Sequence, residues 1–211
     1  MSGDLLSQLI EKVDDLLPQT QCERCGYAGC MPYARAIVVD GAAINRCPPG
    51  GEDTIRLLSK LLSRDSMPVD SKCGRFEGFK VAFIEEPWCI GCQVCVKACP
   101  VDAIVGSARF MHTVIADQCT GCELCVQPCP TSCIRMLSPT QHPTHGIAKT
   151  WSASQAQRAR KDFQARKERL TTDMRKIKEA KRRFRLRRAS NSDKKLAIEA
   201  AVRRVDSRYD G

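Results

Sequence analysis

The sequence predicts an α+β protein made of a small helical module, a duplicated domain of short strands and helices, and a basic helical tail. Apolar residues recur at helical spacing near the start, a cysteine pattern repeats thirty residues apart in the middle, and the excess positive charge lies in the last third. We expect a helical module at 1–66, a linker at 67–79, the duplicated domain at 80–147 and the tail at 148–211.

The first module is predicted to contain three helices. Asp4–Leu17 carries apolar residues on one helical face and stops at Pro18. Pro32–Asp40, followed by Gly41, and Glu52–Ser63 are the second and third helices. No stretch has the length and hydropathy of a secretory signal or a membrane-spanning helix. We therefore expect a reducing, cytoplasmic setting in which most of the fourteen cysteines bind metal instead of forming disulfides.

The middle of the chain contains an internal repeat. Cys89, Cys92, Cys95 and Cys99 recur as Cys119, Cys122, Cys125 and Cys129, and the flanking residues repeat with them. Each half is predicted to form a strand, a cysteine loop, a short helix and a second strand. A duplicated half-domain of this size indicates a pseudo-twofold α+β unit.

The spacing C-x2-C-x2-C-x3-C-P in both halves indicates iron–sulfur clusters. Three thiolates of such a loop can hold three corners of a cubane, while the fourth cysteine points away and ligates the other cluster. Structural zinc prefers two pairs of ligands, which this spacing does not provide. The predicted ligands are Cys89, Cys92, Cys95 and Cys129 for one cluster, and Cys119, Cys122, Cys125 and Cys99 for the other.

Four earlier cysteines follow a different pattern: Cys22, Cys25, Cys30 and Cys47. A thioredoxin-like pair is excluded because no βαβ pattern surrounds them, but their spacing alone leaves zinc as an alternative to a cluster. Of the other cysteines, Cys73 is interpreted as a packing or surface thiol, with a redox-sensing thiol as the alternative. Cys133 is interpreted as a small buried residue, at the position of Ala103 in the first half, with a spare or alternative ligand as the other interpretation. The histidines, His112, His142 and His145, are not expected to be ligands.

The residues that flank these cysteines resemble those of a known protein family. LPQTQCERCGYAGCMPYARAI and INRCPPGG resemble the N-terminal cluster module of the B subunit of Rnf-type (also called Rsx-type) electron-transport complexes. The repeat resembles the bacterial two-[4Fe-4S] ferredoxin domain that follows in that family, so the likeness covers Leu17 to Gly146. It implies a third [4Fe-4S] cluster, on Cys22, Cys25, Cys30 and Cys47. The family usually begins with an apolar membrane-anchoring segment, which this sequence is expected to lack.

The tail has a charge of its own. Up to Ala148 the chain has 13 basic and 16 acidic residues, whereas Lys149–Gly211 has 21 and 8. Phe163, Leu170, Ile177 and Phe184 recur every seven residues along a predicted helix. We expect Ser190–Asp193 to break this helix and Lys194–Arg204 to form another. The tail is interpreted as a solvated helix, as a docking surface for an acidic partner or an anionic membrane, or as a nucleic-acid contact without a recognised reading module.

The motifs lead to an expected function. No nucleophile motif, phosphate loop or dinucleotide fingerprint is present, so no independent catalytic site and no small-molecule substrate are expected. The resemblance implies electron transfer to membrane subunits of a complex that couples electron flow to ion translocation. A free-standing polyferredoxin serving a soluble enzyme and a nucleic-acid-associated iron–sulfur protein are the alternatives. The expected location is the cytoplasm, with peripheral contact at the cytoplasmic face of the inner membrane as a further option.

Overall fold

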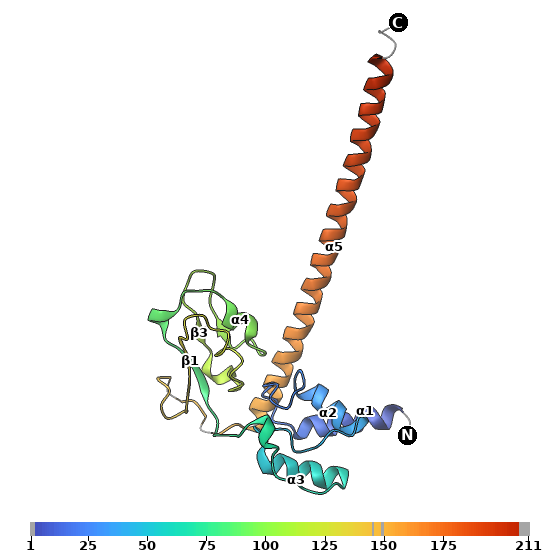
Figure 1. Ribbon diagram of the computed structural model, residues 1–211. Coiled ribbons are helices and arrows are strands. Elements are labelled where there is room, and N and C mark those ends of the chain that lie inside the picture. Colours follow the sequence, from blue (N-terminus) through green and yellow to red (C-terminus); the bar gives the residue numbers. More distant parts are fainter. Residues whose placement is uncertain (1–2, 145, 149, 207–211) are drawn as a thin grey trace. The chain divides into compact units, whose positions relative to one another are not determined.

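The computed structural model describes residues 3–144, 146–148 and 150–206 (Figure 1). It divides into two compact units, Met1–Arg166 and Lys167–Gly211. The helices are α1 (Gly3–Leu16), α2 (Cys30–Val39), α3 (Gly51–Leu62), α4 (Val94–Ala98) and α5 (Ala153–Asp206). The strands are β1 (Val81–Ile84), β2 (Ile104–Val105), β3 (Thr113–Val114) and β4 (Ile134–Leu137).

The three helices predicted for the first module are present. They enclose a core that includes Val13, Tyr33, Ile37 and Leu58, all almost fully buried. Helix α2 starts at Cys30, two residues earlier than expected, so Pro32 lies within its first turn. Proline is tolerated there because the first amide groups of a helix have no intrahelical partner.

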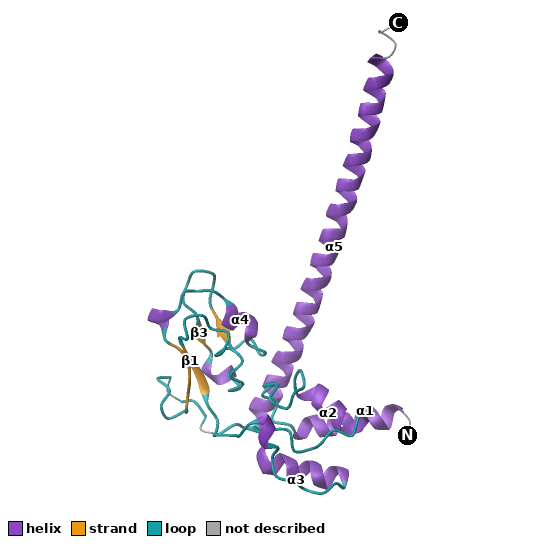
Figure 2. Ribbon diagram, viewed as in Figure 1, coloured by secondary structure: helices purple, strands orange, loops and turns teal. Residues whose placement is uncertain are grey.

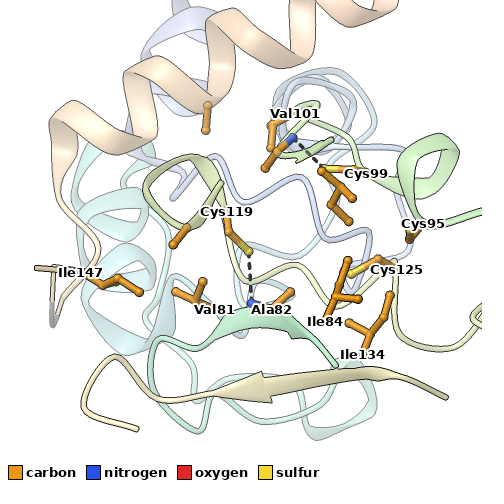
Figure 3. Packing of buried hydrophobic residues seen from close by; sticks show 14 of the residues in the cluster. Val81, Ala82, Ile84, Cys95, Cys99, Val101, Cys119, Cys125, Ile134 and Ile147 are labelled. Carbon is orange, nitrogen blue, oxygen red and sulfur yellow. Dashed lines mark hydrogen bonds between the residues drawn. The ribbon is translucent and has the colours of Figure 1, made fainter. Parts of the chain in front are cut away.

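The duplicated domain forms two antiparallel strand pairs, drawn in orange in Figure 2. Strand β1 pairs with β4, with Ile84 opposite Ile134. Strand β2 pairs with β3, with Ile104 opposite Val114. The two pairings agree with the thirty-residue repeat. Val114 lies thirty residues after Ile84, and Ile104 lies thirty residues before Ile134. The strands and the cysteine loops share one core (Figure 3).

The prediction of a short helix in both halves is wrong for the second half. Helix α4 follows the first cysteine loop, but residues 124–128 form turns instead. The Val126 N–H donates to Glu123 O at 3.0 Å, and the Cys129 N–H donates to Val126 O at 3.2 Å. Pro128 explains the difference, because it has no N–H to give to the carbonyl four residues before it.

The predicted break in the tail is also wrong. Helix α5 runs without interruption through Ser190–Asp193. Serine, asparagine and aspartate each cost at most about 0.7 kcal/mol relative to alanine within a helix. Four such residues without proline or glycine are therefore not enough to end a long helix. None of the helices in the described ranges has the length and hydropathy needed to cross a bilayer.

The first turns of α5 belong to the first compact unit. Ala159 is buried in the core of the duplicated domain, and Trp151 and Phe163 pack against that core. In the second unit, Leu170, Ile177 and Phe184 of the predicted stripe are exposed, at 47%, 47% and 62%. The compact unit thus extends about twenty residues beyond the boundary expected at 147, because the apolar residues at the start of α5 add to its core.

Candidate metal centres

Twelve cysteines lie in three quartets, and each quartet lines a separate cavity. We call the quartets site 1, site 2 and site 3. Site 1 consists of Cys22, Cys25, Cys30 and Cys47. Site 2 consists of Cys89, Cys92, Cys95 and Cys129, and site 3 of Cys99, Cys119, Cys122 and Cys125. The structure thus brings the predicted site residues together in the predicted groups.

The three cavities have the same chemical character. Each is lined by four cysteines among mostly apolar side chains, so one kind of thiolate-bound group fits all three. Within the described residues, no three Cys, His, Asp or Glu side chains converge as ligands of one metal ion. Four soft thiol donors around an apolar space match an iron–sulfur cluster.

Glycines shape the loops of sites 2 and 3. Gly91 and Gly121 have φ of +67° and +69°, in the left-handed region. A Cβ at Gly91 would lie 2.5 Å from Phe110 N, and one at Gly121 would lie 2.5 Å from Lys80 O. Each loop therefore passes so close to a neighbouring stretch of backbone that only glycine fits.

Backbone amides point at the cysteine sulfurs. The Ala82 N–H donates to Cys119 Sγ at 3.4 Å, and the Ala103 N–H donates to Cys99 Sγ at 3.2 Å (Figure 3). Those two sulfurs belong to site 3. At site 2, the His112 N–H donates to Cys89 Sγ at 3.4 Å. Such donations stabilise the negative charge of thiolate ligands.

A chain of buried polar side chains shapes the loop of site 1. Gln21 Oε1 accepts a hydrogen bond from the Cys30 N–H at 2.9 Å, and Gln21 Nε2 donates to Gln19 Oε1. Gln19 Nε2 donates in turn to Asp14 O in α1. Gly29 leaves room for this chain, because a Cβ there would lie 2.7 Å from Gln21 Oε1. Neither glutamine was predicted as a site residue, although Gln21 directly precedes Cys22 and Gln19 lies three residues before it.

Burial controls the protonation of the thiols. It raises the pKa of Cys30 and Cys122 to about 12 and that of Cys95 to about 11. These thiols are neutral near pH 7 when nothing is bound, so ligation must release protons. Burial also acts on Cys129, but hydrogen bonds from the Cys133 N–H and from Thr131 outweigh it and lower the pKa of this thiol.

His112 lies against site 2, a contact that was not predicted from the sequence. Its side chain is 1% exposed, and Nδ1 lies 3.6 Å from Cys89 Sγ and 3.7 Å from Cys95 Sγ. Aligning the two halves of the repeat could have identified this residue, because a histidine, His112, stands where the first half has Ala82. His142 contacts Ala82 O instead, and His145 lies outside the described residues.

The two additional cysteines differ in their surroundings. Cys133 is buried and lines the cavity of site 2, with its Sγ 3.5 Å from Cys129 Sγ. Cys73 is also buried, outside the three quartets, and its Sγ lies 3.9 Å from Asp70 Oδ2. Both are therefore packed residues, and only Cys133 touches a proposed ligand.

The loops of sites 1 and 3 contact each other. Thr120 Oγ1 donates to Thr20 O at 2.9 Å, and Arg24 pairs with Glu123 at 2.7 Å. Trp151 Nε1 donates to Pro18 O at 2.7 Å, while its ring packs on Phe79. The residues of the first two contacts lie one or two positions in sequence from cysteines of the two sites, so site 1 and site 3 are neighbours within the first compact unit.

The same two regions match known protein families. A family model described as a 4Fe-4S dicluster domain matches residues 82–136, and one described as a putative Fe-S cluster matches residues 17–49. A relative from Azoarcus sp., named as the B subunit of the ion-translocating oxidoreductase complex, is 54% identical over 143 residues, which are 68% of this chain and 75% of the relative. The chain belongs to the family of B subunits of ion-translocating oxidoreductase complexes. The resemblance stated from the sequence is therefore confirmed, and the two family models support the prediction of iron–sulfur cluster domains.

Other relatives carry the same name. The one from Hahella chejuensis is 60% identical over 129 residues, covering 61% of this chain and 65% of the relative. The one from Pseudomonas aeruginosa is 63% identical over 126 residues, covering 60% and 65%. The chain thus spans about two thirds of the length of these two relatives. No solved structure matches it.

Proposed function

We propose that this chain holds three [4Fe-4S] clusters and relays electrons as the B subunit of an ion-translocating oxidoreductase complex. The observation that carries the proposal is the presence of three all-cysteine quartets, each of which lines a cavity of its own. When bound, each cluster accepts and releases one electron. The protein contributes ligands, amide donors and apolar surroundings that keep water from the sulfurs.

The proposed ligands are the four cysteines of each site. Sites 2 and 3 exchange ligands, since Cys129 from the second half completes site 2 and Cys99 from the first half completes site 3. This exchange keeps the two sites close together. The matching registers of the two strand pairs support a pseudo-twofold relation between the halves.

The proposed order of the relay is site 1, site 3, site 2. Contacts between Thr20 and Thr120 and between Arg24 and Glu123 join the loops of sites 1 and 3. The exchanged ligands join sites 3 and 2. At the end of this series, Cys92 is exposed to solvent, so site 2 is where electrons can pass to or from another protein.

The proposed partners are other subunits of the complex, including its membrane subunits, because the relatives are named as subunits of such a complex. The basic part of α5 is proposed to add peripheral contact with the anionic cytoplasmic face of a membrane. A free-standing polyferredoxin would need neither contact.

Anaerobic purification of the full chain, with iron and sulfide counted, tests the number of clusters. We expect about twelve of each per chain, since a [4Fe-4S] cluster contributes four. Cys47→Ser should reduce the count to about eight by removing a ligand of site 1. Cys73→Ser is the matched control and should leave it unchanged. A wild-type count of about eight, with or without zinc, would refute the proposal for site 1.

A further inference from the structure

Sites 2 and 3 are equivalent in the repeat, but the side chains around their sulfurs differ. His112 corresponds to Ala82, Thr131 to Val101, and Cys133 to Ala103. All three polar residues lie on site 2. Alanine and valine side chains have no polar hydrogen, so they donate nothing to the sulfurs of site 3.

His112 is oriented as a donor to site 2. Its Nδ1 is 3.6 Å from Cys89 Sγ and 3.7 Å from Cys95 Sγ, and within the described part of the chain its buried Nε2 has no hydrogen-bond partner. A neutral imidazole carries one N–H, and a buried N–H without an acceptor is costly. The proton therefore belongs on Nδ1, where thiolate sulfurs can accept it.

Cys129, the exchanged ligand of site 2, has two further donors. Thr131 Oγ1 lies 3.7 Å and Cys133 Sγ lies 3.5 Å from its sulfur. A ligating thiolate has no hydrogen to give, so the hydroxyl and the thiol must be the donors.

Other features of the two sites do not offset this difference. The amide donations of Ala82 and His112 have the same length of 3.4 Å. The Thr120 side chain is within hydrogen-bonding reach of Cys122, but its one hydroxyl hydrogen is given to Thr20 O at 2.9 Å. The charged side chains near site 3 occur as the pairs Arg24–Glu123 and Arg166–Asp102.

Hydrogen bonds to the sulfurs and exposure to solvent both stabilise the more negative, reduced form of a cluster and thus raise its potential. Cys92 is exposed and Cys129 half-buried, whereas Cys99, Cys119 and Cys125 of site 3 are buried. We infer that site 2 has the higher potential of the two, and that His112, with Thr131 and Cys133, is a positioning residue that sets this difference. The inference rests on the proposed function.

The step is a single electron transfer within the chain. With both clusters bound, one electron would leave site 3 and enter site 2, and no bond or proton would be exchanged. Its direction matches the proposed order of the relay, in which the exposed site 2 comes last.

The test is an EPR-monitored redox titration of the full-length, cluster-loaded chain. His112→Leu keeps the volume but removes the donor, and should lower one of the two midpoint potentials. We expect at least a tenfold change in the equilibrium between the two sites, which is about 59 mV for one electron. His112→Asn keeps an N–H near the position of Nδ1 and should restore part of the potential. The combined change His112→Leu, Thr131→Val and Cys133→Ala should narrow the gap between the two potentials further than His112→Leu alone.

Val101→Thr with Ala103→Cys is the mirror variant. It adds donors to site 3 and should raise the other potential. The inference is overturned if His112→Leu shifts neither potential, shifts both equally, or raises one. If His112→Leu loses iron, Thr131→Val with Cys133→Ala decides the question, and unchanged potentials there overturn it. A wild-type chain with only about eight irons would instead be a failure of the proposed function.

Discussion

Asp14 shows how a single buried charge joins two parts of the first unit. It is 1% exposed, and its Oδ2 lies 3.0 Å from Arg160 in the first turns of α5. Burial raises the pKa of this carboxyl, although Gln19 and Arg160 act in the opposite direction. The folded protein therefore keeps a proton here at a pH at which the unfolded chain has lost it.

This raised pKa predicts a pH effect on stability. In the window between the ordinary aspartate pKa and the raised value, the free energy of unfolding falls as pH increases, because the folded state binds more protons. Asp14→Asn removes this contribution. Melting temperatures measured across the acidic range should show the wild type losing stability relative to the variant as pH rises. Parallel profiles would contradict the prediction.

Gly91 predicts the effect of one methyl group on site 2. Gly91→Ala places a Cβ 2.5 Å from Phe110 N and forces a left-handed conformation that costs about 1–2 kcal/mol for other residues. We expect iron per chain to fall from about twelve towards eight, since site 2 loses its loop geometry. Gly3→Ala, where the Cβ meets no atom within 4 Å, is the control. Full iron content in Gly91→Ala would show that the loop has more room than its distances indicate.

The grouping of the twelve cysteines around three cavities was predictable from the sequence, and the position of His112 was not. Ligand spacing is local, so C-x2-C-x2-C-x3-C fixes which thiols of a loop act together and which one points away. The approach of His112 to Cys89 depends on the pairing of β2 with β3, which no short motif encodes. The glutamines of site 1 were missed for a related reason, because their burial depends on how α1 and α2 pack.

Among the elements, the start of α5 connects two parts of the first unit, which its polar, charged composition does not indicate. Phe163 packs against the duplicated domain and lies next to Gly29 of site 1, while Arg160 pairs with Asp14. Arg166 pairs with Asp102 in the duplicated domain. These turns therefore hold the first module and the duplicated domain together.

Phe163→Ala should destabilise the protein by about 3 kcal/mol, the lower end for a phenylalanine, because the ring is only half-buried. Leu170→Ala, one heptad later on the exposed surface of the helix, should stay within about 0.5 kcal/mol. Denaturant unfolding under anaerobic conditions measures both. Equal effects of the two substitutions would mean that the start of α5 is not part of the core.

The elements were easier to predict than their ends. The amphipathic pattern gave α1 and α3 to within one residue, because a buried stripe and a terminating residue act together. The prediction of a second short helix was wrong because Pro128 lacks the N–H that a helix needs at this position, although the rest of the sequence repeats the first half. The continuous α5 shows the reverse, since weak helix formers at Ser190–Asp193 do not overcome good ones on both sides.

At the scale of the whole molecule, the charge is divided between the two units. Residues 167–211 contain 16 basic and 7 acidic side chains. Membrane contact through this segment predicts that the full chain binds phosphatidylglycerol vesicles, that binding weakens as salt increases, and that a chain ending at Arg166 does not bind. Vesicles of neutral phosphatidylcholine are the control. Equal binding of both chains would place the contact elsewhere, and binding of DNA but not vesicles would favour a nucleic-acid role.

Native mass spectrometry of the anaerobic full-length chain tests the three-cluster relay most directly. The wild type should carry the mass of three [4Fe-4S] clusters. Cys99→Ser should lose the cluster of site 3 alone, because Cys99 completes that site even though it lies in the loop of site 2. A wild type with two clusters and a zinc ion, or a Cys99→Ser variant that loses the cluster held by Cys89, Cys92 and Cys95 instead, would contradict this account.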